Sequence, residues 1–286
     1  SLTHFDLAAM LPQAEARVVQ PDRLYRRLLM GNFLATEALM ARKYCYDRVG
    51  LFDQTLTACE DWDMWLRIAK SFHVVGTTEK LTRCRVVPGS MSSDPERMLR
   101  NRLQVLRKHF SGVGDVSAWD SVQRQAFARA HLATTVEHLQ QGDLESAIDQ
   151  LCIAFELHPK ITEAFDVFYE LAWGSQPKGY RGDFSTLDVK GNAKTLIRVL
   201  NQVFDATASH ALQRCRSTAF GSAYLALGTL SYGAGRMGLA RRFLLRALVS
   251  SPRLALNRRL PATLAKSLLG PMVTDAVRRL PTRGAS

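Results

Sequence analysis

Long apolar runs and paired cysteines are missing from this sequence of 286 residues. No stretch approaches the roughly 18 apolar residues that a membrane-spanning helix needs. The five cysteines are scattered and never form a Cys-x-x-Cys pair, which argues against a zinc site and a disulfide framework and favours a reducing compartment. We therefore expect a cytoplasmic protein, with peripheral attachment to the inner face of the membrane as the alternative location.

Acidic residues are also scarce, because 26 Asp and Glu stand against 38 Lys and Arg and leave a formal net charge of +12. Nucleic acid, an anionic membrane surface and phosphate-bearing substrates would each attract such a chain. No helix-turn-helix, zinc knuckle or RNP-like aromatic strand accompanies the charge, so we expect no nucleic-acid partner. A basic, solvated surface without a charged partner remains the simplest alternative.

Hydrophobic residues make up 47% and charged residues 22% of the chain, which is typical of folded proteins. The length suits about two domains. Because the chain begins at Ser1, within what reads as a folded segment, we expect a fragment whose N-terminal part is absent.

Residues 1–112 mix helical and strand patterns. A helix is expected from Glu60 to about residue 72. A basic helix begins near Asp94-Pro95-Glu96, with proline in its first turn, and runs to about residue 110. Further expectations are strands at 72–78 and 81–89, short helices at 7–14 and 20–30, a buried strand or short helix at 32–41, and a turn at Gly50.

Residues 113–286 have a helical pattern that contains a weak repeat. Residues 142–159 align without a gap with residues 235–252; the matches are Gly142 with Gly235, Ala147 with Ala240, Leu151 with Leu244, Ala154 with Ala247, and Pro159 with Pro252. These are the small-residue and proline positions of a tetratricopeptide-like helical hairpin. Residues 174–192 form a linker-like stretch. Residues 260–280 predict two short helices separated at Pro271, which either cap the helical domain or rest on an anionic bilayer.

Residues 57–70 (TACEDWDMWLRIAK) have the pattern of an amphipathic helix with two adjacent carboxylates at its start. Thr57 and Glu60 have the spacing of a capping box. At about 100° per residue, the expected polar face holds Glu60, Asp63, Arg67 and Lys70, and the expected core face holds Trp62, Trp65, Leu66 and Ala69. Asp61 departs from this pattern, since it projects toward Met64, Trp65 and Ile68. It is either a first-turn acid that the helix dipole stabilises or a carboxylate poised as a general base.

Five sequence motifs lie in order between residues 31 and 92. They are Arg42, then VGLFD at 49–53, EDWDMWLR at 60–67, Cys84-Arg85, and GSMS at 89–92. In this order and spacing, residues 31–110 resemble the C-terminal half of the catalytic domain of family 2 glycosyltransferases, which have the GT-A fold. The resemblance implies inverting transfer of a sugar from a nucleotide-sugar donor to a glycan or lipid-linked acceptor.

The resemblance also implies roles for individual residues. The aspartate of the Glu-Asp pair is the family's general base, which is Asp61 here, and Glu60 would cap the helix and orient its loop. Trp62 and Trp65 would form aromatic walls of the acceptor pocket. Arg85 and Ser90 are candidates for contacts on the diphosphate side.

Two departures from the family pattern limit what this chain would do alone. The nucleotide-binding half of the fold, with the Asp-x-Asp motif that holds Mn²⁺ or Mg²⁺ on the diphosphate, has no counterpart. Val87 stands where many relatives have a histidine. We therefore expect the metal in the full-length enzyme but no metal site in this chain, whose activity in isolation is doubtful.

The expected fold is mixed and mainly α. A truncated α/β segment of GT-A type at 1–112 precedes an all-α domain of helical hairpins at 113–286. The alternative is a non-catalytic helical interaction module, with a protein partner, that carries a degenerate glycosyltransferase remnant.

Overall fold

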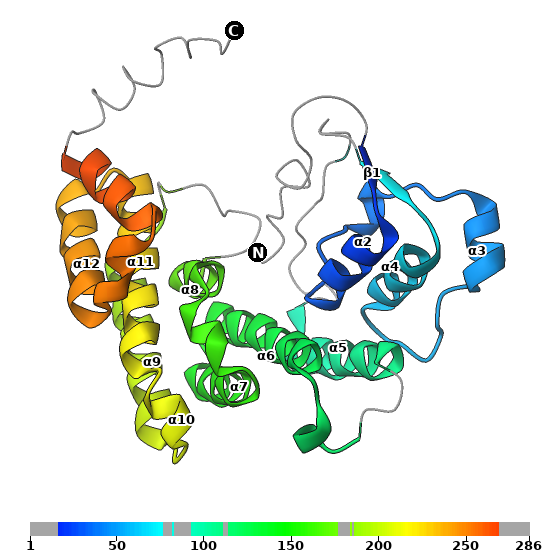
Figure 1. Ribbon diagram of the computed structural model, residues 1–286, viewed down its shortest axis with the longest axis horizontal. Helices are drawn as coiled ribbons and strands as arrows, with labels where there is room; N and C mark the ends of the chain where they lie inside the picture. Colours follow the sequence, from blue (N-terminus) through cyan, green and yellow to red (C-terminus); the bar gives the residue numbers. More distant parts are fainter. Residues whose placement is uncertain are drawn as a thin grey trace, which may run out of the picture. The chain divides into compact units, whose positions relative to one another are not determined.

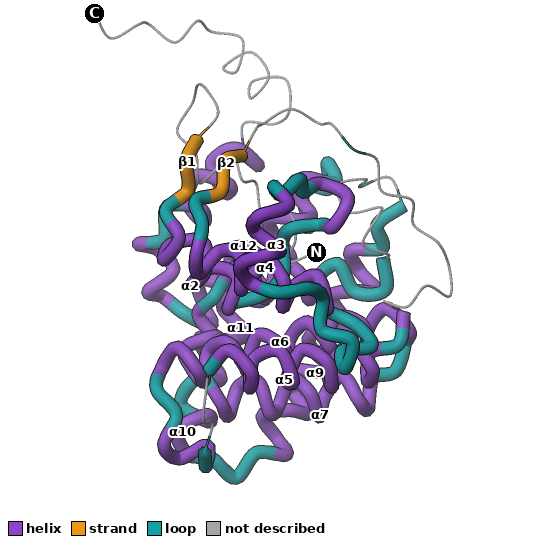
Figure 2. The backbone as a smooth tube through the Cα atoms, turned by 90° about the vertical axis from the view of Figure 1, so that its right-hand side faces the viewer, coloured by secondary structure: helices purple, strands orange, loops and turns teal. Residues whose placement is uncertain are grey.

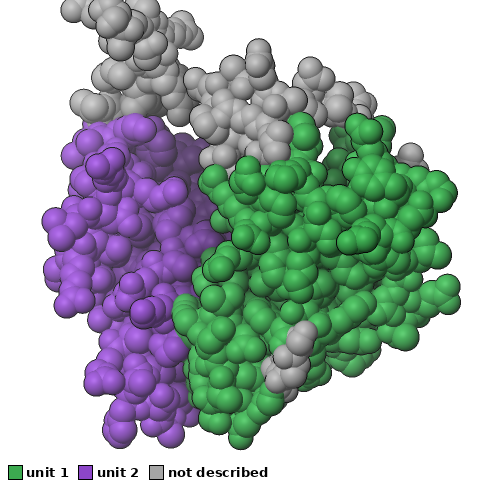
Figure 3. Space-filling view, turned by 45° about the vertical axis from the view of Figure 1, so that its right-hand side comes forward, with its two compact units in different colours: residues 1–138, 145–158 green, residues 139–144, 159–286 purple. Residues whose placement is uncertain are grey.

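The computed structural model describes residues 17–76, 82, 93–110, 114–176, 184 and 186–268, and this part of the chain is mainly helical (Figure 1). The chain divides into two compact units (Figure 3). Unit 1 comprises residues 1–138 and 145–158, and unit 2 comprises residues 139–144 and 159–286. Unit 1 therefore extends past the boundary expected between residues 112 and 113. The mainly helical character is confirmed, whereas the GT-A-like segment stays a prediction.

Unit 1 contains a small sheet and several helices. Its elements are β1 (Arg17–Val19), α2 (Pro21–Leu29), the 3₁₀ turn η1 (Thr36–Ala38), α3 (Lys43–Val49), α4 (Glu60–Ser71), β2 (Val74–Gly76), α5 (Pro95–His109), the 3₁₀ turn η3 (Val116–Ala118), α6 (Ser121–Gln141) and α7 (Leu144–Leu157). The two strands pair antiparallel with Val18 opposite Val75, and Figure 2 shows them side by side.

Most expected elements of unit 1 appear in the structure. The helices near 20–30, 60–72 and 94–110 are confirmed as α2, α4 and α5, and the strand at 72–78 as the shorter β2. β1 was not predicted. Of the buried strand or short helix expected at 32–41, no strand forms; the segment is a loop that contains the short 3₁₀ turn η1, and Met40 in it is 97% exposed. The helix expected at 7–14 and the strand at 81–89 lie outside the described residues, apart from residue 82.

α4 lies at the centre of the unit 1 core. Its buried apolar side chains are Trp62, Met64, Trp65, Leu66, Ile68 and Ala69, and they pack in one cluster with Leu24 and Leu28 of α2 and Val105 and Leu106 of α5. Each large apolar side chain buried in this way contributes about 2 kcal/mol. α4 is therefore held on several sides rather than along one stripe.

α5 is capped at its N-terminus and tied to α6 at its middle. Its N-cap Asp94 accepts a hydrogen bond from the Arg97 backbone N–H. Farther along, the Arg102 guanidinium donates to Thr134 and to the Glu137 carboxylate of α6, with both partners of the ion pair largely buried. A buried bidentate pair of this kind specifies orientation. α5 therefore presents Asn101, Lys108 and His109 toward α4 in a defined register.

The repeat predicted from sequence corresponds to two helical hairpins, α6 with α7 and α11 (Arg216–Gly233) with α12 (Met237–Ser250). Both turn at a glycine with positive φ, +77° at Gly142 and +70° at Gly235, a conformation that other residues rarely adopt. The remaining aligned positions of the second helices are fully buried in both copies, namely Ala147, Leu151 and Ala154 in α7 and Ala240, Leu244 and Ala247 in α12. Each hairpin continues into a 3₁₀ turn that begins at the aligned proline, Pro159 or Pro252.

Unit 2 is built from helices throughout its described part. They are η4 (Pro159–Glu163), α8 (Phe165–Ala172), α9 (Val189–Ala206), α10 (His210–Gln213), α11, α12, η6 (Pro252–Leu256) and a helix over residues 259–268. α9 begins inside the expected linker 174–192, because Asp188 caps it by accepting from the Gly191 N–H. Residues 260–268 of the predicted C-terminal segment are helical, as expected for its first short helix, whereas the break at Pro271 and the second helix lie outside the described residues. No helix in the described ranges is both long and apolar enough to span a membrane.

Candidate functional site at the start of helix α4

The expected capping box at the start of α4 does not form. The helix begins at Glu60, two residues later than the box requires, and its N-cap is Cys59 without a side-chain hydrogen bond. The physical reason is Asn101 of α5, whose buried Oδ1 accepts the N–H groups of Thr57 (2.9 Å) and Ala58 (3.2 Å), while its Nδ2 donates to the Thr57 hydroxyl. The N–H that Glu60 was expected to cap is therefore already bonded, and Glu60 remains half-buried at the first helical position.

Cys59 occupies an unusual backbone conformation next to the two carboxylates. Its φ of 61° is the one positive value among the described non-glycine residues. Such backbone strain costs on the order of 1–3 kcal/mol and gathers at functional sites. Burial, opposed by the charge of Arg102 and helped by nearby carboxylates, raises the pKa of the Cys59 thiol to about 12. The thiol is therefore protonated at neutral pH, the form that is a poor nucleophile.

Asp61 is half-buried and is held by the loop before η1 together with the first residue of η1. Its Oδ2 accepts hydrogen bonds from Asn32 Nδ2 (3.1 Å) and from the Thr36 hydroxyl (3.0 Å), and its Oδ1 accepts from the Trp62 N–H. The carboxylate therefore has a polar surrounding rather than the apolar flank expected from helical spacing. Burial raises the pKa of Asp61, and the charge of Glu60 adds to this, while the three hydrogen bonds oppose it; the net pKa is raised.

Trp62 and Trp65 lie in the core. Trp62 is 3% exposed and donates its indole N–H to the Leu28 carbonyl at 2.8 Å. Trp65 is 5% exposed and meets the ring of Phe52 edge-on. Contact of these two rings with a substrate stays a prediction, and their burial weighs against it. Arg85 and Ser90, the other predicted binding residues, lie outside the described residues.

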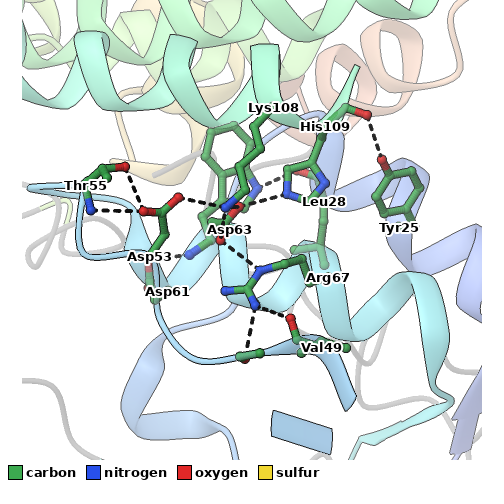
Figure 4. A network of polar contacts seen from close by, with 12 residues as sticks. Tyr25, Leu28, Val49, Asp53, Thr55, Asp61, Asp63, Arg67, Lys108 and His109 are labelled. Carbon is green, nitrogen blue, oxygen red and sulfur yellow. Dashed lines mark hydrogen bonds and ion pairs between the residues drawn. The ribbon is translucent and has the colours of Figure 1, made fainter. Parts of the chain in front are cut away.

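Asp63 was missed as an important residue. Its spacing with Arg67 predicted an exposed ion pair on a polar face, but the Asp63 side chain is completely buried, and Figure 4 shows it in contact with Arg67, Lys108 and His109. Its carboxylate is 2.9 Å from Arg67 Nε, 2.9 Å from Lys108 Nζ and 3.1 Å from His109 Nε2. Burial alone would raise the pKa of Asp63. Hydrogen bonds from His109 and Lys108, together with the charges of Arg67 and Lys108, outweigh burial and lower the pKa to about 2.

The Asp63 network extends to the loop that carries the VGLFD motif. Arg67 donates to the backbone carbonyls of Val49 (2.6 Å), Gly50 and Leu51 (2.8 Å). Lys108 binds Asp53 at 2.8 Å, and this hydrogen bond, together with those from Thr55, lowers the pKa of Asp53. Gly50, at the expected turn, has a φ of +83°. The network therefore links the loop 49–53, α4 and α5 to one another through side-chain contacts.

The described residues do not fit a divalent cation. Asp61 and Asp63 have Asp-x-Asp spacing, but residues two apart on a helix point about 200° apart. Their carboxylates also bind different partners, since Asp63 is already neutralised by Arg67 and Lys108. No group of three or more His, Cys, Asp and Glu side chains within the described ranges is placed to hold a metal ion.

Comparison with protein-family models, with curated proteins and with solved structures gives no match for this chain.

Proposed function

We propose that this chain is the acceptor-side part of an inverting glycosyltransferase of family 2, with Asp61 as its general base. The order and spacing of five motifs over residues 31–92 support the proposal. The observation that carries it is the placement of Asp61, a half-buried carboxylate at the start of α4 that side chains from a loop 25 to 29 residues upstream hold in one orientation. We also propose a cytoplasmic location, peripheral at the inner face of the membrane.

In the proposed reaction, Asp61 takes the proton of an acceptor hydroxyl. The hydroxyl oxygen forms a bond to the anomeric carbon of the donor sugar, and the bond from that carbon to the diphosphate breaks on the opposite face. The bonding electron pair leaves with the diphosphate, so the anomeric configuration is inverted. A raised pKa makes Asp61 a stronger base than an exposed aspartate, and a positioned base of this kind contributes about 10²–10⁴-fold to the rate.

The other motif residues have a positioning role in this proposal. Asp63, Arg67 and Lys108 fix the register of α4 against the loop 49–53. Asn32 and Thr36 then orient the Asp61 carboxylate relative to the helix. No step of the mechanism is assigned to a metal ion, because the described carboxylates do not fit one.

The test is Asp61→Asn in the enzyme with its donor half present. We expect the turnover, measured as release of nucleoside diphosphate from a nucleotide-sugar donor, to fall at least a hundredfold with an unchanged thermal midpoint, because a proton acceptor is lost and packing is kept. Asp22→Asn, on the exposed surface of α2, is the matched control and should retain full turnover. Turnover of the Asp61 variant within threefold of wild type would remove Asp61 from this role.

The second candidate is a non-catalytic module that binds a protein through its helical hairpins. The observation that favours it is the correspondence of α6–α7 with α11–α12, since paired hairpins of this kind commonly form binding surfaces. The same experiment separates the two candidates. An enzyme with both halves present that releases no diphosphate from any nucleotide sugar would favour the interaction module.

A further inference from the structure

α12 exposes a face that combines cations with aliphatic side chains. The residues on this face, called here the α12 face, are Arg241, Arg242, Leu245, Arg246 and Val249, which follow helical spacing and are all exposed. Leu245 is 54% exposed and Val249 is 83% exposed. The opposite face of α12 contributes Ala240, Phe243, Leu244 and Ala247 to the core. Two large aliphatic side chains one helical turn apart, facing solvent between arginines, are unusual on a helix whose other face is already buried.

The segment of the chain that contains α12 and its two main packing neighbours carries charge of one sign. Residues 206–268 contain ten Lys and Arg and no Asp or Glu. α11 and η6, the elements that pack most closely on α12, therefore bring no carboxylate to this surface. The Arg246 guanidinium lies over the Tyr224 ring at 5.8 Å and the Arg241 Nε donates to its own helix at Met237, so neither head group is neutralised by these contacts. Charge complementarity therefore favours an anionic partner for this face.

We propose that the α12 face docks on an anionic lipid bilayer. The arginines would bind head-group phosphates, and Leu245 and Val249 would enter the boundary between head groups and acyl chains. The exposed aliphatic side chains favour a lipid bilayer over a nucleic acid, because the arginines alone would be enough to bind a nucleic acid. α9 provides the contrast within unit 2, because Lys190, Lys194 and Arg198 form an exposed cationic row on it without an exposed large apolar side chain. This inference does not depend on the transfer chemistry, and it stands if Asp61 is not catalytic.

The test is cosedimentation of the full chain with vesicles of phosphatidylcholine alone or with one third phosphatidylserine. We expect binding only to the anionic vesicles, weakened by salt. Arg241→Glu with Arg242→Glu should lower the binding constant by at least about 20-fold, at roughly fivefold per cation engaged. Leu245→Ser with Val249→Ser, which changes no charge, should lower it by about tenfold through loss of apolar burial.

The matched control is Lys194→Glu with Arg198→Glu on α9. It makes the same change in net charge away from the α12 face, and we expect less than about a threefold effect because exposed charges are screened over distance. All six positions are exposed, so circular dichroism and the thermal midpoint should match wild type in each variant.

Several results would overturn the proposal. They are no binding to anionic vesicles, equal binding to phosphatidylcholine vesicles, or equal loss from the α9 and α12 charge reversals. A chain that binds a single-stranded RNA homopolymer but not vesicles, with Leu245→Ser and Val249→Ser leaving that binding unchanged, would assign the face to nucleic acid instead.

Discussion

Asp63→Asn should destabilise unit 1 strongly, although sequence alone places this residue on the surface. The pKa of Asp63 falls from its ordinary value of 3.8 to about 2 in the folded protein. At about 1.4 kcal/mol per pKa unit, the ionised carboxylate contributes about 2.5 kcal/mol to the free energy of unfolding at neutral pH. Asparagine keeps the shape of the side chain but leaves Arg67 and Lys108 without their shared anion, so we expect a total loss of about 3 kcal/mol.

The stabilisation that Asp63 provides should decrease as the pH is lowered. Because the folded-state pKa is lowered, the contribution of Asp63 is complete above its unfolded pKa and is lost as the pH falls through its folded pKa. The difference in unfolding free energy between wild type and Asp63→Asn should therefore narrow by about 1 kcal/mol between pH 5 and pH 3. Urea unfolding followed by tryptophan fluorescence measures it, since Trp62 and Trp65 lie beside Asp63 on α4.

Asp47→Asn is the matched control for Asp63→Asn. Asp47 also pairs with a cation four residues away on a helix, Lys43, but the two side chains are 58% and 89% exposed. An exposed pair of this kind contributes about 0.5 kcal/mol or less. The reasoning fails if the two variants lose similar stability, or if the deficit of Asp63→Asn is the same at both pH values.

Two further predictions, one of them with a matched control variant, test the packing of the α11–α12 hairpin and the start of α4. Gly228→Ala should lower the free energy of unfolding by about 1–3 kcal/mol, because a Cβ there would lie 2.7 Å from Leu244 Cγ. The control Gly238→Ala, with open space around its Cβ, should be neutral or slightly stabilising. Thermal unfolding compares the two variants, and equal midpoints would contradict the close contact at Gly228. Asn101→Ala should lower the free energy of unfolding by about 2–3 kcal/mol, because the buried backbone N–H of Ala58 loses its acceptor and the Thr57 N–H must bind water instead. Urea unfolding measures this loss. A loss below about 0.5 kcal/mol would show that other contacts hold the start of α4.

Local sequence signals predicted the elements whose causes are local. The proline and the N-cap Asp94 mark the start of α5, and the glycines Gly142 and Gly235 mark the hairpin turns. The capping box at Thr57 failed because its competitor, Asn101, lies 44 residues farther along the chain. No reading of a 14-residue window could have included that partner.

The burial of Asp63 escaped prediction for a related reason. An Asp and an Arg four residues apart have the same sequence pattern on an exposed helix and on a buried one. The partners that decide the matter, Lys108 and His109, lie 45 and 46 residues away on α5. The burial of Asp63 could have been predicted only with the knowledge that α4 and α5 pack together. That contact brings the Lys-His pair of α5 to the carboxylate and Arg67 of α4.

The motif residues therefore fall into two groups, according to whether their substitution is expected to affect stability or activity. Asp53, Asp63 and Arg67 belong to a buried or partly buried network that holds the loop 49–53 to α4. A fold that needed this assembly for stability alone would carry the same residues at the same spacing. Loss of activity in an Asp63 variant would consequently be explained by a weakened scaffold and would not support a catalytic role for Asp63. Asp61 differs, because it is half-buried and Asn32 and Thr36 hold it from a surface loop. Only a substitution at Asp61 that spares stability tests the proposed role of this carboxylate as a base separately from the stability of the surrounding network.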